Sequence, residues 1–135
     1  VILDRYVASN IAYNAAKLAV AERAELTAWI EQLEYGLFAL PRPDLTLLLA
    51  TATDLADRLV GRKDKRAYTR AARDLHEADR DFLAVVAEVY GGLAAAGSDA
   101  WLRVDPTDDA GNLRPPADIA ATVWQHPGLS GLVSR

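Results

Sequence analysis

Apolar residues recur at helical spacing along much of the chain and predict its main helices. Residues 11–20 are rich in alanine and favour a helix. Residues 22–40 carry one apolar stripe at three- and four-residue steps, formed by Leu26, Trp29, Ile30, Leu33, Leu37 and Leu40. A second stripe predicts a long helix over about 71–96 and consists of Leu75, Ala78, Phe82, Val85, Val89 and Leu93. Residues 118–125 predict a last helix, after which we expect the tail from Pro127 to fray.

Short apolar runs between these helices predict strands. Residues 45–50 are almost continuously apolar, which is typical of a strand buried on both faces. Residues 1–3 and 101–104 are shorter runs of the same kind, and residues 53–60 predict a short capped helix. Strands that alternate with helices indicate an α/β fold, in which helices flank a sheet of parallel strands.

Length and composition limit the possible functions. The 135 residues fit one domain, residues 1–135. The net charge of −4 argues against a general nucleic-acid binder. The absence of cysteine excludes thiolate zinc sites, and two histidines are too few for a histidine-rich metal site. No apolar run approaches the roughly 18–20 residues of a membrane helix, so we expect no membrane partner.

The first candidate site follows the opening apolar run. Asp4 and Arg5 fall where an open α/β sheet binds ligands, at the carboxyl end of a strand. The guanidinium of Arg5 suits a phosphate, and Asn10 offers the donor and acceptor that a base edge requires. Tyr13 lies three residues after Asn10 and would share its helix face. This set suits a nucleoside monophosphate. The alternative is structural: Arg5 would pair with Asp4, Ser9 or Asn10 would cap a helix, and Tyr13 would pack.

The second candidate is a basic segment that begins after Gly61. Twelve positions hold six of the fifteen basic residues, namely Arg62, Lys63, Lys65, Arg66, Arg70 and Arg73. Such a cluster on a glycine-led loop can close over a polyphosphate and stabilise the transferring charge. The alternative is a solvated charged surface. No G-x-x-x-x-G-K-[ST] motif occurs among the eight glycines.

Residues 2–13 closely resemble the Asp-Arg-Tyr segment of bacterial thymidylate kinases, in particular of the actinobacterial branch. The resemblance continues in order through four segments: 40–45, the Leu-Pro-x-Pro-Asp entry to a strand; 55–58, the helix before the lid; 61–74, the lid; and 101–106, the last strand with its Val-Asp-Pro exit. It implies a P-loop nucleoside monophosphate kinase-like fold. It also implies phosphoryl transfer from ATP to dTMP, giving dTDP, with Mg²⁺, in a cytoplasmic homodimer.

The resemblance also implies roles for residues of the first motif. Arg5 would hold the dTMP phosphate, Asn10 would hydrogen-bond thymine, and Tyr13 would crowd the 2′ position of the sugar. Asp4 would support the phosphate and metal region, and Ser9 belongs to the same substrate-binding set. Positioning and charge stabilisation carry this chemistry, so no covalent residue is required.

Further roles fall on the lid and its helix. Asp74 and Glu77 would line the monophosphate pocket, and Arg58 would lie against the ATP adenine. The lid arginines near the transferring phosphates would be Arg62, Arg66 and Arg70. His76 stands where an aromatic residue is common in the family, which is a departure from its pattern.

The family begins with a strand, a phosphate loop, a helix and a second strand that have no counterpart here. We therefore expect an incomplete kinase fold, without its first strands and phosphate loop, that is inactive alone. Two alternatives stay open. One is another nucleoside or nucleotide kinase of the same fold, and the other is a non-catalytic helical module whose apolar stripes form an oligomer interface.

Overall fold

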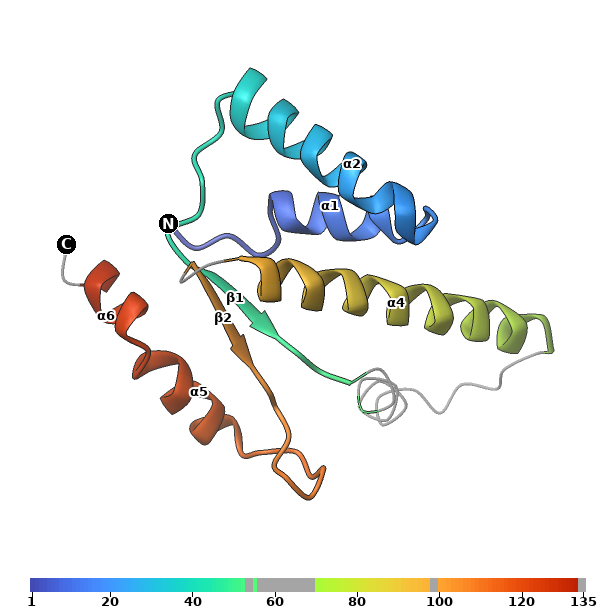
Figure 1. The fold of residues 1–135 in the computed structure, drawn as a ribbon. Coiled ribbons are helices and arrows are strands. Elements are labelled where there is room, and N and C mark those ends of the chain that lie inside the picture. The colour runs from blue at the N-terminus through green and yellow to red at the C-terminus, as the bar shows by residue number, and fades with distance from the viewer. Residues whose placement is uncertain (53–54, 56–69, 98–99, 134–135) are drawn as a thin grey trace.

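The computed structural model describes residues 1–52, 55, 70–97 and 100–133, with the backbone alone at 70–78, 130 and 133. The elements, in chain order, are α1 (Val7–Ala15), α2 (Val20–Glu31), the π-helix η1 (Gln32–Leu37), β1 (Thr46–Leu49), α4 (Arg70–Ala96), β2 (Trp101–Val104), α5 (Pro116–Trp124) and α6 (Pro127–Val133). Helices α1, α2 and α4 gather on one side of the strands, and α5 and α6 lie on the other (Figure 1).

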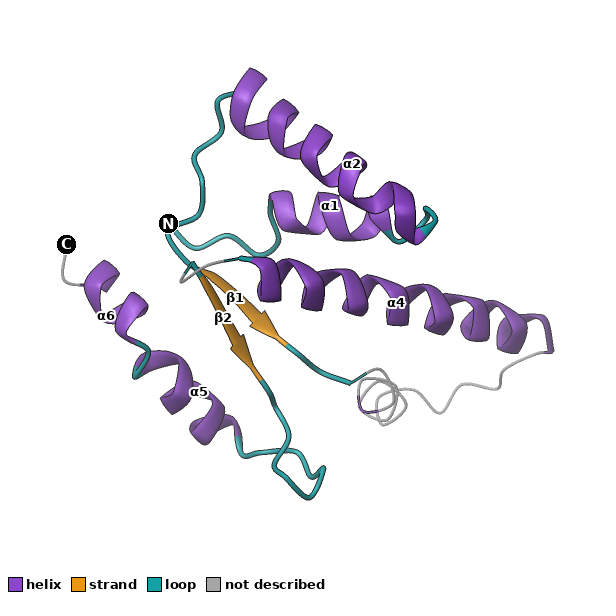
Figure 2. Cartoon of the chain, in the orientation of Figure 1, coloured by secondary structure: helices purple, strands orange, loops and turns teal. Residues whose placement is uncertain are grey.

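Within the described residues the sheet has two strands, and they are parallel (Figure 2). The register runs from Thr46 opposite Trp101 to Leu49 opposite Val104. Both α4 and α5 contact β2. The predicted α/β arrangement, parallel strands flanked by helices, is therefore confirmed.

Two expectations about strands are wrong. Residues 1–3 form no strand but an exposed coil. Their apolar side chains favour extended backbone, yet the parallel ladder described here joins β1 to β2 alone. The strand β1 is also not buried on both faces, because Leu47 and Leu49 are 43% and 54% exposed. Its apolar run is continuous, but its burial alternates as in a half-covered strand.

The long helix predicted over residues 22–40 divides into α2 and η1. The hydrogen bond from Phe38 N to Leu33 O, at 2.9 Å, spans five residues and marks the π-helical turn. A π-helical turn shifts the side-chain register that an α-helical stripe assumes. Leu37 of this stripe is accordingly 75% exposed. Trp29 lies in α2 before this turn and is also 57% exposed, whereas its neighbour Ile30 is buried.

The main buried cluster joins the first two helices. Val7, Ile11 and Ile30 form its centre, and the residues packed against it are Tyr6, Leu26, Tyr35, Leu40 and Leu93. Ala12 and Ala15 of α1 are completely buried, and their small side chains let neighbouring helices approach closely. The helix α1 carries most of the first candidate motif, and the cluster fixes it between α2 and α4.

The predicted helices 71–96 and 118–125 are confirmed as α4 and α5. The tail does not fray at Pro127, because Pro127 begins α6 and Leu129 N donates to His126 O at 3.0 Å. Proline suits a first helical position, where its missing N–H has no partner to lose. Of the predicted helix 53–60, only Leu55 is described, as a buried helical residue.

Candidate active site

Arg5 has an unusual backbone in the loop that leads into α1. Its φ of +68° lies in the left-handed region, which disfavours residues with a Cβ by about 1–2 kcal/mol. Tyr6 follows with extended backbone and is the N-cap of α1. Neither Ser9 nor Asn10 caps the helix, so the capping part of the structural alternative is wrong. Strained residues of this kind cluster at binding sites and are held by the surrounding structure.

Arg5 and Tyr13 are brought together, eight positions apart in sequence. The Arg5 guanidinium carbon lies over the Tyr13 ring, 5.2 Å from its centroid, as a cation–π contact. The other neighbour of Tyr13 is Phe82 of α4, whose ring meets it edge-on at 6.1 Å and 66°. A guanidinium and two rings thus connect the loop, α1 and α4. Asp4 precedes Arg5 in the same loop and is exposed.

Ser9 connects the same two helices. Its hydroxyl forms a hydrogen bond with the Tyr90 hydroxyl, Oγ to Oη 2.5 Å. Ser9 pairs with Tyr90 and Tyr13 with Phe82, so residue numbers rise along α1 while they fall along α4. The two helices are therefore antiparallel.

Asn10 faces a different neighbour. Its Nδ2 donates to Oε1 of Glu34 in η1 at 2.8 Å, and its Oδ1 accepts from Asn14 Nδ2 at 2.8 Å. A primary amide has two N–H donors and two acceptor lone pairs, so each end of Asn10 keeps one group for a ligand. Tyr35 follows Glu34, and burial raises the pKa of its phenol against the opposing effect of Arg42.

The acidic residues of the second motif lie on α4. Asp74 and Glu77 are eight and five residues before Phe82 in this helix, on the side of the antiparallel pair where α1 ends. The structure describes only the backbone of these two residues and of Arg70 and His76. The backbone therefore places Asp74 and Glu77 on the helix that contacts Tyr13.

The remaining predicted residues, Arg58, Arg62 and Arg66, lie outside the described part of the chain. The same holds for the predicted lid, residues 61–74, apart from the start of α4. Their roles stay predictions.

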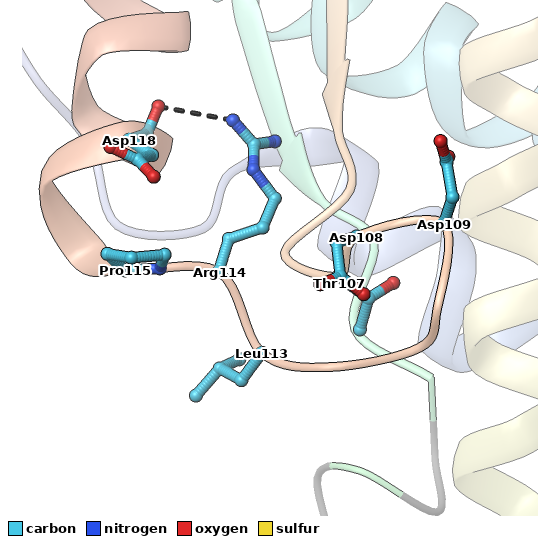
Figure 3. Close-up of a pocket in the computed structure, with 7 residues that line it drawn as sticks. All are labelled: Thr107, Asp108, Asp109, Leu113, Arg114, Pro115 and Asp118. Carbon is cyan, nitrogen blue, oxygen red and sulfur yellow. Dashed lines mark hydrogen bonds between the residues drawn. The ribbon is translucent and has the colours of Figure 1, made fainter.

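Two open pockets of comparable size lie among the described residues. One, of about 360 Å³, lies between α1 and α2 beside Asn10 and is lined by Asn10, Asn14, Lys17, Leu18, Leu26, Trp29 and Ile30. The other, of about 450 Å³, lies far along the chain and is lined by Thr107, Asp108, Asp109, Leu113, Arg114, Pro115 and Asp118 (Figure 3).

Several groups around the second pocket are paired within their own loop or with α5. Arg114 donates to the backbone oxygens of Asp105 and Asp118 and to the Thr122 hydroxyl, at 2.9, 3.2 and 2.7 Å. Hydrogen bonds from Thr107 hold the pKa of Asp105 below its ordinary value. This pocket is therefore the surface of a hydrogen-bonded loop, and it contains none of the predicted site residues.

Sequence reasoning did not find three residues that support the site: Glu34, Phe82 and Tyr90. Phe82 belongs to the predicted apolar stripe of α4, so its burial was expected but its contact with Tyr13 was not. Glu34 and Tyr90 reach α1 from 24 and 81 residues away. No local pattern signals such pairs.

Comparison with known proteins decides the family. The family model for thymidylate kinase matches residues 1–112. The chain belongs to the thymidylate kinase family. Thymidylate kinases of two strains of Mycobacterium tuberculosis, CDC 1551 / Oshkosh and H37Rv, are each 40% identical to it over 121 residues. These alignments cover 86% of this chain and 56% of each relative, so the chain spans little more than half their length.

The resemblance that the motifs suggested is thus confirmed, and the fold is that of a P-loop kinase-like α/β protein. The family match covers the elements from α1 to β2, whereas α5 and α6 follow it. Within the described residues no helix is long and apolar enough to cross a membrane. Nor do the described side chains include a group of three candidate metal ligands.

Proposed function

We propose that the protein carrying this chain transfers the γ-phosphoryl group of ATP to dTMP and forms dTDP. The observation that carries the proposal is the placement of Arg5. Arg5 has a strained backbone just before α1, and its guanidinium lies over the ring of Tyr13 in the last turn of α1, within a segment that matches the thymidylate kinase family. An exposed guanidinium held this way can take a phosphate as a bidentate partner without losing much side-chain freedom.

Other described residues of the motif carry groups that suit a nucleoside monophosphate, although Asn10 faces η1 and Tyr13 faces α4. Asn10 keeps one donor and one acceptor for a pyrimidine edge, and Tyr13 offers a ring edge and hydroxyl to the sugar. Asp74 and Glu77 complete the proposed monophosphate pocket from α4, and Ser9 holds α1 to that helix.

The donor side of the reaction is part of the same proposal. ATP would be held by Arg58 and by the lid arginines Arg62, Arg66 and Arg70, which supply positive charge as the phosphoryl group transfers. Asp4 fits Mg²⁺ by its chemistry, because an exposed carboxylate is a hard oxygen ligand. A cytoplasmic location and a homodimer also belong to this proposal.

The test is dTMP-dependent formation of ADP by the protein expressed from its complete coding sequence. We expect turnover with dTMP, and none from the 135-residue chain by itself. Another kinase of the same fold would instead prefer dCMP or a deoxynucleoside. Absence of turnover with dTMP in the complete protein would overturn the proposal.

One observation favours a second candidate, the helical interaction module. Trp29, Leu37 and Phe38 are 57%, 75% and 59% exposed on α2 and η1 and at the residue after η1, and exposed large apolar residues are typical of contact surfaces. A dimer by mass measurement that does not bind dTMP in titration would support this candidate over the kinase.

A further inference from the structure

The amide of Asn10 stands in a chain of four side chains that runs from Lys17 to Glu34. Lys17 Nζ donates to Asn14 Oδ1 at 3.4 Å, and Asn14 Nδ2 donates to Asn10 Oδ1 at 2.8 Å. Asn10 Nδ2 then donates to Glu34 Oε1 at 2.8 Å. Every donor in this chain points the same way, from α1 towards η1.

The two end residues of this hydrogen-bonded series, Lys17 and Glu34, determine that direction. An ammonium group can only donate hydrogen bonds, and an ionised carboxylate can only accept them. Lys17 therefore faces the oxygen of Asn14, and Glu34 faces the nitrogen of Asn10. The Asn14 amide is fixed a second time, because its Nδ2 also donates to the backbone oxygen of Asn10 at 2.9 Å.

Glu34 is itself held in place. It is half-buried in the π-helical turn, and its backbone oxygen accepts from Leu40 N at 3.0 Å. The π-helix, marked by the bond from Phe38 N to Leu33 O, sets the register that turns Glu34 towards α1. Such turns are frequent at functional sites.

Amide direction matters for reading a base. The thymine edge presents an acceptor at O4 and a donor at N3, so it needs an amide with nitrogen at O4 and oxygen at N3. Cytosine presents the reverse pattern, a donor at N4 and an acceptor at N3, and fits the same amide turned over. An unrestrained asparagine can adopt either orientation, so it reads neither edge selectively.

We propose that Glu34 and Lys17 are positioning residues that fix the direction of the Asn10 amide and thereby select a thymine or uracil edge over a cytosine edge. The inference rests on the proposed function, in which Asn10 contacts the base. Neither Glu34 nor Lys17 needs to touch the nucleotide, since both act through asparagine side chains.

The experiment compares dTMP, dUMP and dCMP as acceptors for the complete protein, by kcat/KM. In Glu34→Ala the Asn10 amide can turn over. We expect kcat/KM to fall about tenfold for dTMP and equally for dUMP, which has the same edge, while that for dCMP is unchanged or rises. Glu34→Gln keeps an oxygen acceptor and should restore part of the selectivity. The exposed carboxylate Glu25 of α2 provides the control, Glu25→Ala, with selectivity unchanged.

Three outcomes separate the ideas. An equal loss with all three nucleotides in Glu34→Ala would show a merely structural residue and overturn the inference. If that variant does not fold, Lys17→Met decides. It should lower the ratio of kcat/KM for dTMP to that for dCMP in the same direction but by less, because Asn14 keeps its bond to the Asn10 backbone oxygen. If the unchanged protein does not phosphorylate dTMP at all, the proposed function itself fails, whatever the variants do.

Discussion

The two ends of the described chain hold their polar side chains in opposite ways. Around the pocket after β2, partners lie close in sequence: Thr107 bonds to Asp105, two residues away, and Arg114 bonds to the Asp105 backbone, nine residues away. Around α1, local pairs are joined by distant ones: Glu34 reaches Asn10 across 24 residues, and Tyr90 reaches Ser9 across 81.

The two regions also differ in strain and in spare bonding capacity. The Arg114 guanidinium donates to one oxygen of its own loop and two of α5, whereas the Arg5 guanidinium lies on an aromatic ring beside a strained backbone. A ring contact leaves the N–H groups of arginine available for a phosphate. The proposed site therefore differs from the loop after β2 in backbone strain and in unused hydrogen-bonding groups, not in pocket volume.

The sharpest test of this contrast removes the Arg5 guanidinium. We expect Arg5→Ala in the complete protein to lower kcat/KM for dTMP by about 10- to 150-fold, since a charge-assisted phosphate contact contributes about 1.5–3 kcal/mol. The exposed arginine of β2 gives the matched control, Arg103→Ala, which should keep its activity. Steady-state kinetics with varied dTMP measures both, and unchanged kinetics in Arg5→Ala would remove Arg5 from the site.

The backbone strain at Arg5 predicts a second effect, on stability. Arg5→Gly and Arg5→Ala both lose the guanidinium, but glycine adopts a φ of +68° without a Cβ clash. We expect the glycine variant to be more stable than the alanine variant by about 1 kcal/mol. Urea denaturation of the two proteins gives the difference.

Two further glycine variants make that stability test specific. Ala39→Gly relieves a second left-handed residue, at φ +51°, and should stabilise the protein while activity remains. Ala24→Gly lies inside α2 at ordinary helical φ and should destabilise it by about 1 kcal/mol. If all the glycine variants lose stability alike, Arg5 is not strained.

Local pattern predicted much of the fold and the members of the motif. The stripe of α4 fixed its extent, and the short apolar run at residues 101–104 proved to be β2. The spacing of Arg5, Asn10 and Tyr13 identified residues that do lie at the start of α1 and along it. These features depend on periodicities of a few residues, which the sequence displays directly.

Other features depend on distant contacts and could not be predicted. The π-helical turn of η1 interrupts a stripe that reads as one continuous helix, so the exposure of Leu37 was unexpected. Asn10 and Tyr13 were expected to act together on one face, yet they face η1 and α4 respectively. Which neighbour each contacts depends on how three helices pack, and no spacing within α1 contains that information.

The ring contact between α1 and α4 can be measured as a coupling energy. Phe82→Leu keeps an apolar side chain but removes the edge-on ring, and Tyr13→Leu removes its partner. We expect the double variant to be less destabilised than the sum of the single variants by about 0.5–1.5 kcal/mol, the usual value for an aromatic pair. Urea denaturation of the unchanged protein, the two single variants and the double variant gives the four unfolding free energies that this double-mutant cycle needs. Additive effects would mean that the two rings do not support each other.

The smallest expected effect belongs to the loop after β2 and depends on pH. Hydrogen bonds from the Thr107 hydroxyl and N–H lower the pKa of Asp105 from 3.8, so the ionised form is favoured by folding. That contribution is complete above pH 3.8 and is lost as the pH falls through the lower pKa of the folded state. Asp105 is exposed to solvent, which screens the interaction to well below about 1 kcal/mol.

Thr107→Val removes the hydroxyl but keeps the N–H, so the pKa of Asp105 measured by NMR titration should rise part of the way to 3.8. Kinetics with dTMP should not change in this variant, whereas a loss of activity would contradict the assignment of the loop to structure and of α1 to the site.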